Sequence, residues 1–186
     1  MITMINKAIR DPNNFIKIMQ IYIGRVVGHH DYKKFIVLSR NRTGSNMLIS
    51  MLNSHPSIYA RYEIIRTLNG NSVHDVLNKF YSRYPRFVKA VGFKIFYYHP
   101  VDDKSGTVWD KLKEMEDLYI IHLKRRNILR TILSKEIAQM TKAWMKRCDK
   151  ETIESREKKV HIDENELLKA FKQTRGWECT YEQMFR

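Results

Sequence analysis

Short apolar runs that alternate with helix-like segments restrict the fold of this chain more than any other feature of its sequence. The first run, residues 35–38 (FIVL), is short and continuous, as is typical of a strand buried in a parallel sheet. A polar turn at 39–46 follows, and an apolar stretch at 47–52 predicts a helix that ends before Pro56. This order of strand, turn and helix predicts an α/β fold.

The same alternation continues along the chain. The patterns predict further helices at 73–80 and 109–115 and further strands at 58–62, 90–97 and 118–123. Strands separated by helices favour a mostly parallel central sheet with helices on both faces, which is a three-layer arrangement. Ligands bind such sheets at the carboxyl ends of the strands.

Two further helices are predicted from residues that commonly begin a helix. Asn127 is a suitable N-cap for a helix behind the fourth strand, and Asp163 is one for the last helix of the chain. Along the first of these helices, apolar side chains recur at spacings of four or three, which predicts one apolar face. That face consists of Leu129, Leu133, Ile137, Met140 and Trp144.

The first strand-to-helix turn has the composition of an anion site. Such a turn directs backbone N–H groups and the positive end of the helix dipole toward one point. Gly44 lets the backbone approach a ligand, and Arg40 and Arg42 supply charge that can bind two oxygens at once. The turn also fits a plain turn with an N-cap, and it is not a Walker A loop. Side-chain hydrogen-bond donors for an anion at this turn would come from Thr43, Ser45 and Asn46.

The fourth strand runs into a second basic turn, Lys124-Arg125-Arg126. Three cations in succession repel one another unless an anion lies beside them. Arg126, Arg130 and Ser134 follow at intervals of four, so the last two share a helix face. The turn fits either a phosphate site or a solvated basic helix start. Two separate anion sites would suit a nucleotide that carries phosphate on its ribose as well as at its 5′ end.

The charge of the whole chain also indicates an anionic partner. Lys and Arg number 34 against 20 Asp and Glu, a net charge of +14. A nucleotide, a nucleic acid, an acidic glycan and a membrane surface are all compatible with this excess. A non-catalytic nucleic-acid-binding protein is one alternative, although no recognised nucleic-acid motif supports it. A small-molecule kinase of the P-loop type is another, and the missing Walker A lysine argues against it.

Three blocks of the sequence resemble a known family. Residues 39–46 (SRNRTGSN) with 52–56 (LNSHP), 92–99 (GFKIFYYH) and 121–130 (IHLKRRNILR) are similar to motifs of bacterial carbohydrate sulfotransferases. The most similar members are the nodulation-factor, lipopolysaccharide and trehalose enzymes. The resemblance implies the P-loop-like three-layer fold of sulfotransferases. It also implies transfer of a sulfuryl group from 3′-phosphoadenosine-5′-phosphosulfate (PAPS) to a hydroxyl of a carbohydrate or glycolipid, without a metal ion.

The resemblance further implies roles for single residues. Arg42 would contact the bridging oxygen of the leaving phosphosulfate, and Glu63 would be the general base. Arg126 and Ser134, whose interval of eight is that of the family, would hold the 3′-phosphate. The remaining ligands of the nucleotide would be Arg40, Thr43, Gly44, Ser45 and Asn46.

Some side chains near these motifs fit plainer interpretations as well. Glu63 could be a surface carboxylate paired with Arg61 or Arg66. Lys94 could reach the site or be a structural lysine whose charged end extends to water. Tyr97 and Tyr98 could line a sugar site or serve only to pack their strand.

We expect a single domain of 186 residues. It would comprise an N-terminal helical extension (1–30), a cofactor-binding core (31–146) and a charged linker with the last helix (147–186). Residues 16–27 predict an amphipathic helix that either packs on the domain or makes a peripheral membrane contact. Family members continue past the position of Arg186, so the resemblance implies a shortened C-terminus.

The cysteines and the N-terminal sequence indicate the cellular compartment of the protein. Cys148 and Cys179 lack the CxxC spacing of a zinc site, and a bridge between them is left open. Two cysteines in a chain of this size fit a reducing compartment, and no signal peptide or membrane-spanning run is recognised. We therefore expect a cytoplasmic protein. The sequence indicates neither the identity of the acceptor nor the oligomeric state.

Overall fold

The computed structural model of the chain describes residues 16, 19–21, 23–24, 28–142 and 160–186. Within these residues four strands form one sheet: β1 (Lys33–Ser39), β2 (Ile58–Arg61), β3 (Ala90–Phe96) and β4 (Leu118–Leu123). Their order is β2-β3-β1-β4, and every neighbouring pair is parallel. The predicted strands and the parallel sheet are confirmed.

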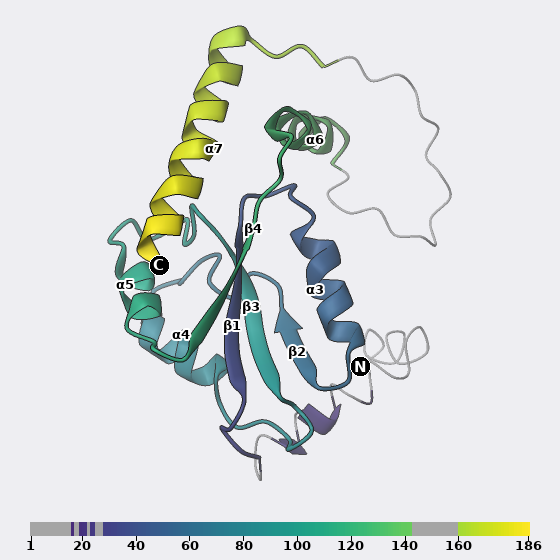
Figure 1. Ribbon diagram of the computed structural model, residues 1–186, viewed down its shortest axis with the longest axis vertical. Helices are drawn as coiled ribbons and strands as arrows, with labels where there is room; N and C mark the ends of the chain where they lie inside the picture. Colours follow the sequence, from purple (N-terminus) through teal and green to yellow (C-terminus); the bar gives the residue numbers. More distant parts are fainter. Residues whose placement is uncertain (1–15, 17–18, 22, 25–27, 143–159) are drawn as a thin grey trace.

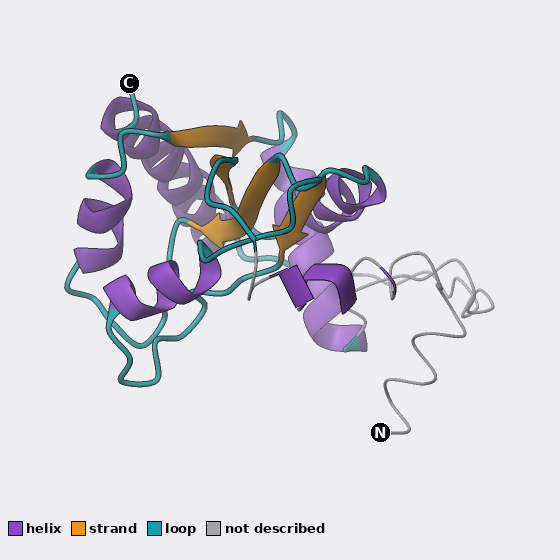
Figure 2. Ribbon diagram, turned by 90° about the horizontal axis from the view of Figure 1, so that it is seen from below, coloured by secondary structure: helices purple, strands orange, loops and turns teal. Residues whose placement is uncertain are grey.

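Helices connect the strands and cover both faces of the sheet. α3 (Ser45–Ser54) covers one face, whereas α4 (Val73–Phe80) and α5 (Thr107–Lys113) cover the other (Figure 1). Two further helices, α6 (Ile128–Thr141) and α7 (Glu164–Met184), follow β4. Figure 2 shows the sheet from below, between its two helical layers. The expected α/β class is therefore confirmed.

Side chains alternate along β1 between two cores. Phe35 and Val37 share a cluster with Ile49 of α3. Ile36 and Leu38 belong to the larger cluster on the opposite face. All four of these β1 side chains are buried. A strand enclosed on both faces needs an uninterrupted apolar run, which is the physical reason for the run in the sequence.

The apolar face predicted for α6 is exposed, and the helix packs on the protein through a neighbouring face. Leu129, Ile137 and Met140 are 40%, 37% and 62% exposed. Trp144 lies outside the described residues. The stripe that faces the protein begins one residue earlier, at Ile128, and is less uniformly apolar. Its buried residues are Ile128, Thr131, Ile132 and Ala138.

Both predicted N-caps are confirmed. The side chain of Asn127 accepts a hydrogen bond from the backbone N–H of Arg130 at 2.9 Å. The side chain of Asp163 accepts bonds from the N–H groups of Asn165 and Glu166 at 2.9 and 3.1 Å. These bonds satisfy backbone donors that the first turn of a helix leaves unpaired, so α6 and α7 begin where the sequence predicts.

The two ends of the chain are described in part. Residues 16, 19–21, 23 and 24 are helical, and Ile21 is buried in the larger core, as in a helix packed on the domain. Residues 147–159 of the expected linker, with Cys148, lie outside the described residues. Cys179 is a free and exposed thiol on α7. In the described part of the chain, no helix combines the length and the apolar character needed to cross a bilayer.

The carboxyl ends of the strands form the edge at which the predicted site residues gather. β1 and β4 are parallel neighbours, and Ser39 at the end of β1 pairs with Leu123 at the end of β4. The turns that follow these two strands therefore leave the sheet side by side. α6 lies beyond this edge, and α7 descends from it along the side of the sheet that α5 covers (Figure 1).

Candidate active site

The turn between β1 and α3 begins the helix without a side-chain cap. Gly44 is the N-cap residue and has a left-handed φ of 96°. A Cβ at this position would meet no atom within 4 Å, so the backbone conformation, and not lack of space, favours glycine. The first N–H groups of α3 and the positive end of its dipole are consequently suited to an anion.

Two predicted ligands in this turn have partners within the protein. The Arg40 guanidinium is buried and donates to the hydroxyl of Thr174 on α7. Burial lowers the pKa of Arg40, while Tyr98 and Glu178 oppose that shift. The hydroxyl of Thr43 donates to the backbone oxygen of Arg40 at 2.8 Å. Arg40 thus secures α7 and Thr43 shapes the turn, and their roles as nucleotide ligands stay predictions.

The two basic turns contact each other. Arg42 donates from Nε to the Oγ of Ser134 on α6 at 2.9 Å. Arg125 donates from Nη1 to the backbone oxygen of Arg42 at 3.0 Å. Arg126, the next residue, is exposed just before α6. The residues predicted to hold the two ends of one nucleotide therefore lie at the same edge of the sheet.

Glu63 follows β2 and forms an ion pair with Lys94 of β3. The Lys94 Nζ lies 2.9 Å from a carboxylate oxygen of Glu63 and also donates to the Oδ1 of Asn46, in the first turn of α3. The side chain of Lys94 is 2% exposed and that of Glu63 is 24% exposed. Burial lowers the pKa of Lys94, and the Glu63 carboxylate opposes this shift. Lys94 therefore links the predicted base, Glu63, to Asn46 at the start of α3. The sequence pointed to Lys94 because a lysine within an apolar strand is unusual.

A neutral histidine lies near this ion pair. The Nδ1 of His99 accepts a bond from the backbone N–H of Phe96 at 3.3 Å, so a proton of the neutral ring is carried by Nε2. Burial lowers the pKa of His99 to about 4; Arg66 and Lys94 act in the same direction, and Glu63 acts against them. His99 is therefore uncharged near pH 7 and has the character of a hydrogen-bond donor beside Glu63.

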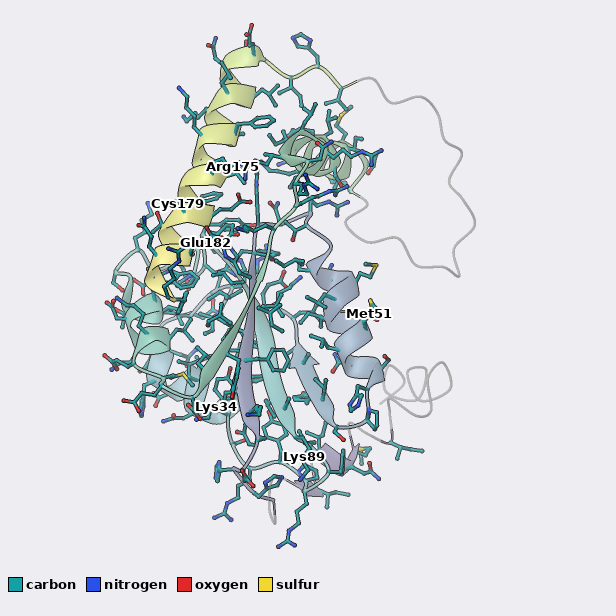
Figure 3. The ribbon with its side chains drawn as sticks, in the orientation of Figure 1. Lys34, Met51, Lys89, Arg175, Cys179 and Glu182 are labelled. Carbon is teal, nitrogen blue, oxygen red and sulfur yellow. The ribbon has the colours of Figure 1, made fainter. Side chains whose placement is uncertain are left out.

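α7 is bound to the starts of both turns, a contribution that the sequence did not indicate. Lys124 of the second turn pairs with Glu182, which Figure 3 labels on the lower part of α7. Tyr181 donates to the backbone oxygen of Tyr97 at 2.7 Å, and the Tyr97 hydroxyl lies 2.7 Å from Nε2 of His122. Burial lowers the pKa of His122, helped by Lys124. Together with the bond from Arg40 to Thr174, these contacts hold α7 against the protein next to the two turns.

A cavity of about 660 Å³ lies at the opposite, amino-terminal edge of the sheet. Figure 3 labels Lys34 and Lys89 at this lower edge. The cavity combines lysines with carboxylates, so it suits an anion less well than the carboxyl edge does. Its lining residues are Asp31, Tyr32, Lys33, Lys89, Glu116, Asp117, Leu118 and Tyr119.

A cation could be held by clustered His, Cys, Asp or Glu side chains. In the part of the chain that the structure describes, no group of three such side chains is arranged to hold one.

Curated proteins from Rhizobium are similar to this chain in sequence. Nodulation protein H of Rhizobium meliloti (strain 1021) is 30% identical over 129 residues, which cover 60% of this chain and 50% of the relative. Nodulation protein H of Rhizobium tropici is 31% identical over 128 residues, 60% of this chain and 49% of the relative. Over this stretch the chain is similar in sequence to nodulation protein H. The resemblance to the nodulation group that the motifs predicted is confirmed.

The similarity to nodulation protein H covers only part of that protein. The chain spans about half the length of these relatives. No protein-family model matches the chain, and no solved structure matches it. The name nodulation protein H assigns no role to a single residue, so the roles of Arg42, Glu63, Arg126 and the other predicted ligands stay predictions.

Proposed function

We propose that this protein is a sulfotransferase that moves the sulfuryl group of PAPS to a hydroxyl of a carbohydrate or glycolipid. The observation that carries the proposal is that Arg42 of the first basic turn contacts both Arg125 of the second turn and Ser134 of α6, the helix that follows it. A nucleotide with phosphates at both ends of its ribose needs two cationic sites at one sheet edge, one for each anion. Homology to nodulation protein H supports the same assignment.

The donor would bind across both turns. Its 5′-phosphosulfate would lie at the N-terminus of α3, where Gly44 keeps the approach open and Ser45 and Asn46 present backbone N–H groups. Its 3′-phosphate would lie at the start of α6, held by Arg126 and Ser134. A guanidinium group binds two phosphate oxygens at once, which suits the exposed side chain of Arg126.

The transfer would be an in-line displacement. Glu63 would take the proton of the acceptor hydroxyl while that oxygen forms a bond to sulfur. The bond between sulfur and the bridging phosphate oxygen would break, and Arg42 would stabilise the negative charge that develops on the leaving 3′-phosphoadenosine-5′-phosphate (PAP). Lys94 would hold the Glu63 carboxylate next to Asn46 and so near the donor, since it bonds to both side chains.

Nucleotide selectivity tests the donor assignment. PAP should bind much more tightly than ADP or AMP, because only PAP fills both anion sites. A thermal-shift series at equal ligand concentrations measures this, since a ligand at one hundred times its Kd adds about 2.7 kcal/mol to the unfolding free energy. Equal shifts for all three nucleotides would contradict the proposal. A preference for ADP would favour a kinase, and salt-sensitive binding of DNA alone would favour a nucleic-acid-binding protein.

Replacement of the predicted base tests the chemistry. Glu63→Gln keeps the size of the side chain but removes its basicity, so we expect the transfer rate to fall by roughly 10²- to 10⁴-fold. The affinity for PAP should stay within about threefold, because the donor turns are unchanged. Glu114→Gln is the matched control, since Glu114 pairs with Lys111 on the surface of α5. A normal rate in Glu63→Gln would remove Glu63 from the mechanism.

A further inference from the structure

Aromatic rings gather around the ion pair of Glu63 and Lys94. The Lys94 Nζ lies 5.2 Å from the centre of the Tyr62 ring and 5.0 Å from that of Phe96. Tyr62 directly precedes Glu63 and is 43% exposed. Tyr98, whose ring centre is 5.6 Å from that of Phe96, is 37% exposed. Two exposed tyrosines thus flank the buried Lys94 and the half-buried Glu63, the predicted base.

The ring of Tyr98 is held on several sides. Besides Phe96, its neighbours are His99 at 5.2 Å and Trp177 of α7 at 5.9 Å between ring centres. Burial raises the pKa of Tyr98 to about 12 and the nearby charge of Glu63 adds to the shift, so the hydroxyl remains a donor. A ring fixed by its neighbours loses little conformational entropy when a ligand packs on it.

The loops beside these rings are bound to each other. The carboxylate of Asp102 accepts bonds from the backbone N–H groups of Leu68 and Asn69 at 2.9 and 2.8 Å. The N–H of Val101 donates to the backbone oxygen of Arg66 at 3.0 Å. These bonds therefore hold the loop after β2 and the loop after β3 together.

We propose that Tyr62 and Tyr98 form the acceptor site and bind the pyranose rings of an oligosaccharide. This inference rests on the proposed function, because it takes Glu63 as the base that receives the proton of the sugar hydroxyl. Sugar rings present C–H groups on their faces and hydroxyls at their edges. Exposed aromatic faces beside a carboxylate that is partly open to solvent offer partners to both kinds of group. Apolar rings with a few placed polar groups are also the usual make-up of a small-molecule site.

The test measures sugar binding directly, without turnover. Cellotetraose and the tetramer of β-1,4-linked N-acetylglucosamine are titrated into the full chain, with and without PAP, by calorimetry and saturation-transfer NMR. We expect at least one tetrasaccharide to bind. Tyr98→Ala and Tyr62→Ala should each weaken its binding by about tenfold, whereas the Phe variants should stay within about threefold because the ring is retained.

The control is Tyr119→Ala, which removes a tyrosine that is 54% exposed at the opposite edge of the sheet and should bind sugar like the unmodified chain. The melting temperature and the affinity for PAP verify that each variant is folded. Tyr62→Ala keeps the test decisive if Tyr98→Ala is unstable, because Tyr62 is the more exposed ring.

The outcomes separate this inference from the proposed function. If neither tetrasaccharide binds, or if the Ala variants bind as tightly as the unmodified chain, the acceptor site is overturned while PAP selectivity can still stand. If the sugar depends on both tyrosines but PAP binds no better than AMP, the acceptor site stands and the donor assignment fails.

Discussion

The turn after β1 and the turn after β4 lie side by side, yet they offer different groups to an anion. At the first turn, the N-cap is Gly44, which has no side chain to occupy the backbone donors of α3. At the second turn, Asn127 uses its own side chain to cap α6. The charged groups of the first turn are partly drawn into the protein, as with Arg40, whereas Arg126 of the second turn is exposed.

This difference indicates which groups of each turn would bind a phosphate. The first turn is suited to bind through backbone N–H groups and the helix dipole, which depend on the path of the chain. The second turn is suited to bind through guanidinium groups, which depend on individual side chains. Loss of one side chain should therefore weaken phosphate binding more at the second turn, whereas a change of backbone conformation should weaken it more at the first.

Arg42 belongs to the first turn and bonds to Ser134 of α6, so its removal should have the largest effect. We expect Arg42→Ala to lower the transfer rate by roughly 10²- to 10³-fold, as does the loss of other groups that stabilise a developing negative charge. Steady-state kinetics with PAPS measure it. Arg86→Ala, which removes an exposed arginine preceding β3, is the control and should keep its rate. An active Arg42→Ala enzyme would refute the role of Arg42.

Arg126→Ala should have the next largest effect. It should weaken binding of the 3′-phosphate of PAP and leave binding of the 5′-phosphate unchanged. A hydrogen bond between charged groups contributes about 1.5 to 3 kcal/mol, so the Kd for PAP should rise by about ten- to hundredfold. The Kd for AMP, which lacks the 3′-phosphate, should be unchanged. Calorimetry with both nucleotides measures the difference. Equal weakening of PAP and AMP would mean that Arg126 does not distinguish the two ends.

Gly44→Ala should disturb the first turn through its backbone. A left-handed conformation costs a residue with a Cβ about 1 to 2 kcal/mol, which should appear as a lower unfolding free energy. PAP and AMP should both bind more weakly, and by the same factor, because both place a 5′-phosphate at α3. Gly106→Ala is a matched control, since Gly106 has a φ of 81° and precedes α5. It should lose similar stability without any change in nucleotide affinity.

Asn127→Ala should have the smallest effect and should change stability more than binding. Loss of an N-cap typically costs about 1 kcal/mol, which chemical denaturation can measure. Asp163→Ala, at the N-cap of α7, should lose a similar amount. A fall in PAP affinity of more than about tenfold in Asn127→Ala would show that the cap itself takes part in anion binding.

Local signals predicted the elements of this fold well. The apolar run at the first strand predicted β1, and Asn127 and Asp163 predicted the starts of α6 and α7, because strand burial and capping depend on residues close together in the chain. The spacing of Leu129, Ile137 and Met140 predicted an apolar face of α6, but this face is exposed in the structure. Periodicity reports that a helix is amphipathic, but the surroundings decide which of two neighbouring stripes is buried.

The sequence by itself determined the order of strands and helices, the two basic turns and the candidates for the base and the ligands. Only the tertiary structure decided their partners. Thr174 lies 134 positions from Arg40 along the chain, and Lys94 lies 31 positions from Glu63, yet each pair is in contact. No spacing rule reaches that far, because such contacts depend on how the parallel strands pair and on where α7 packs, and many residues decide both together.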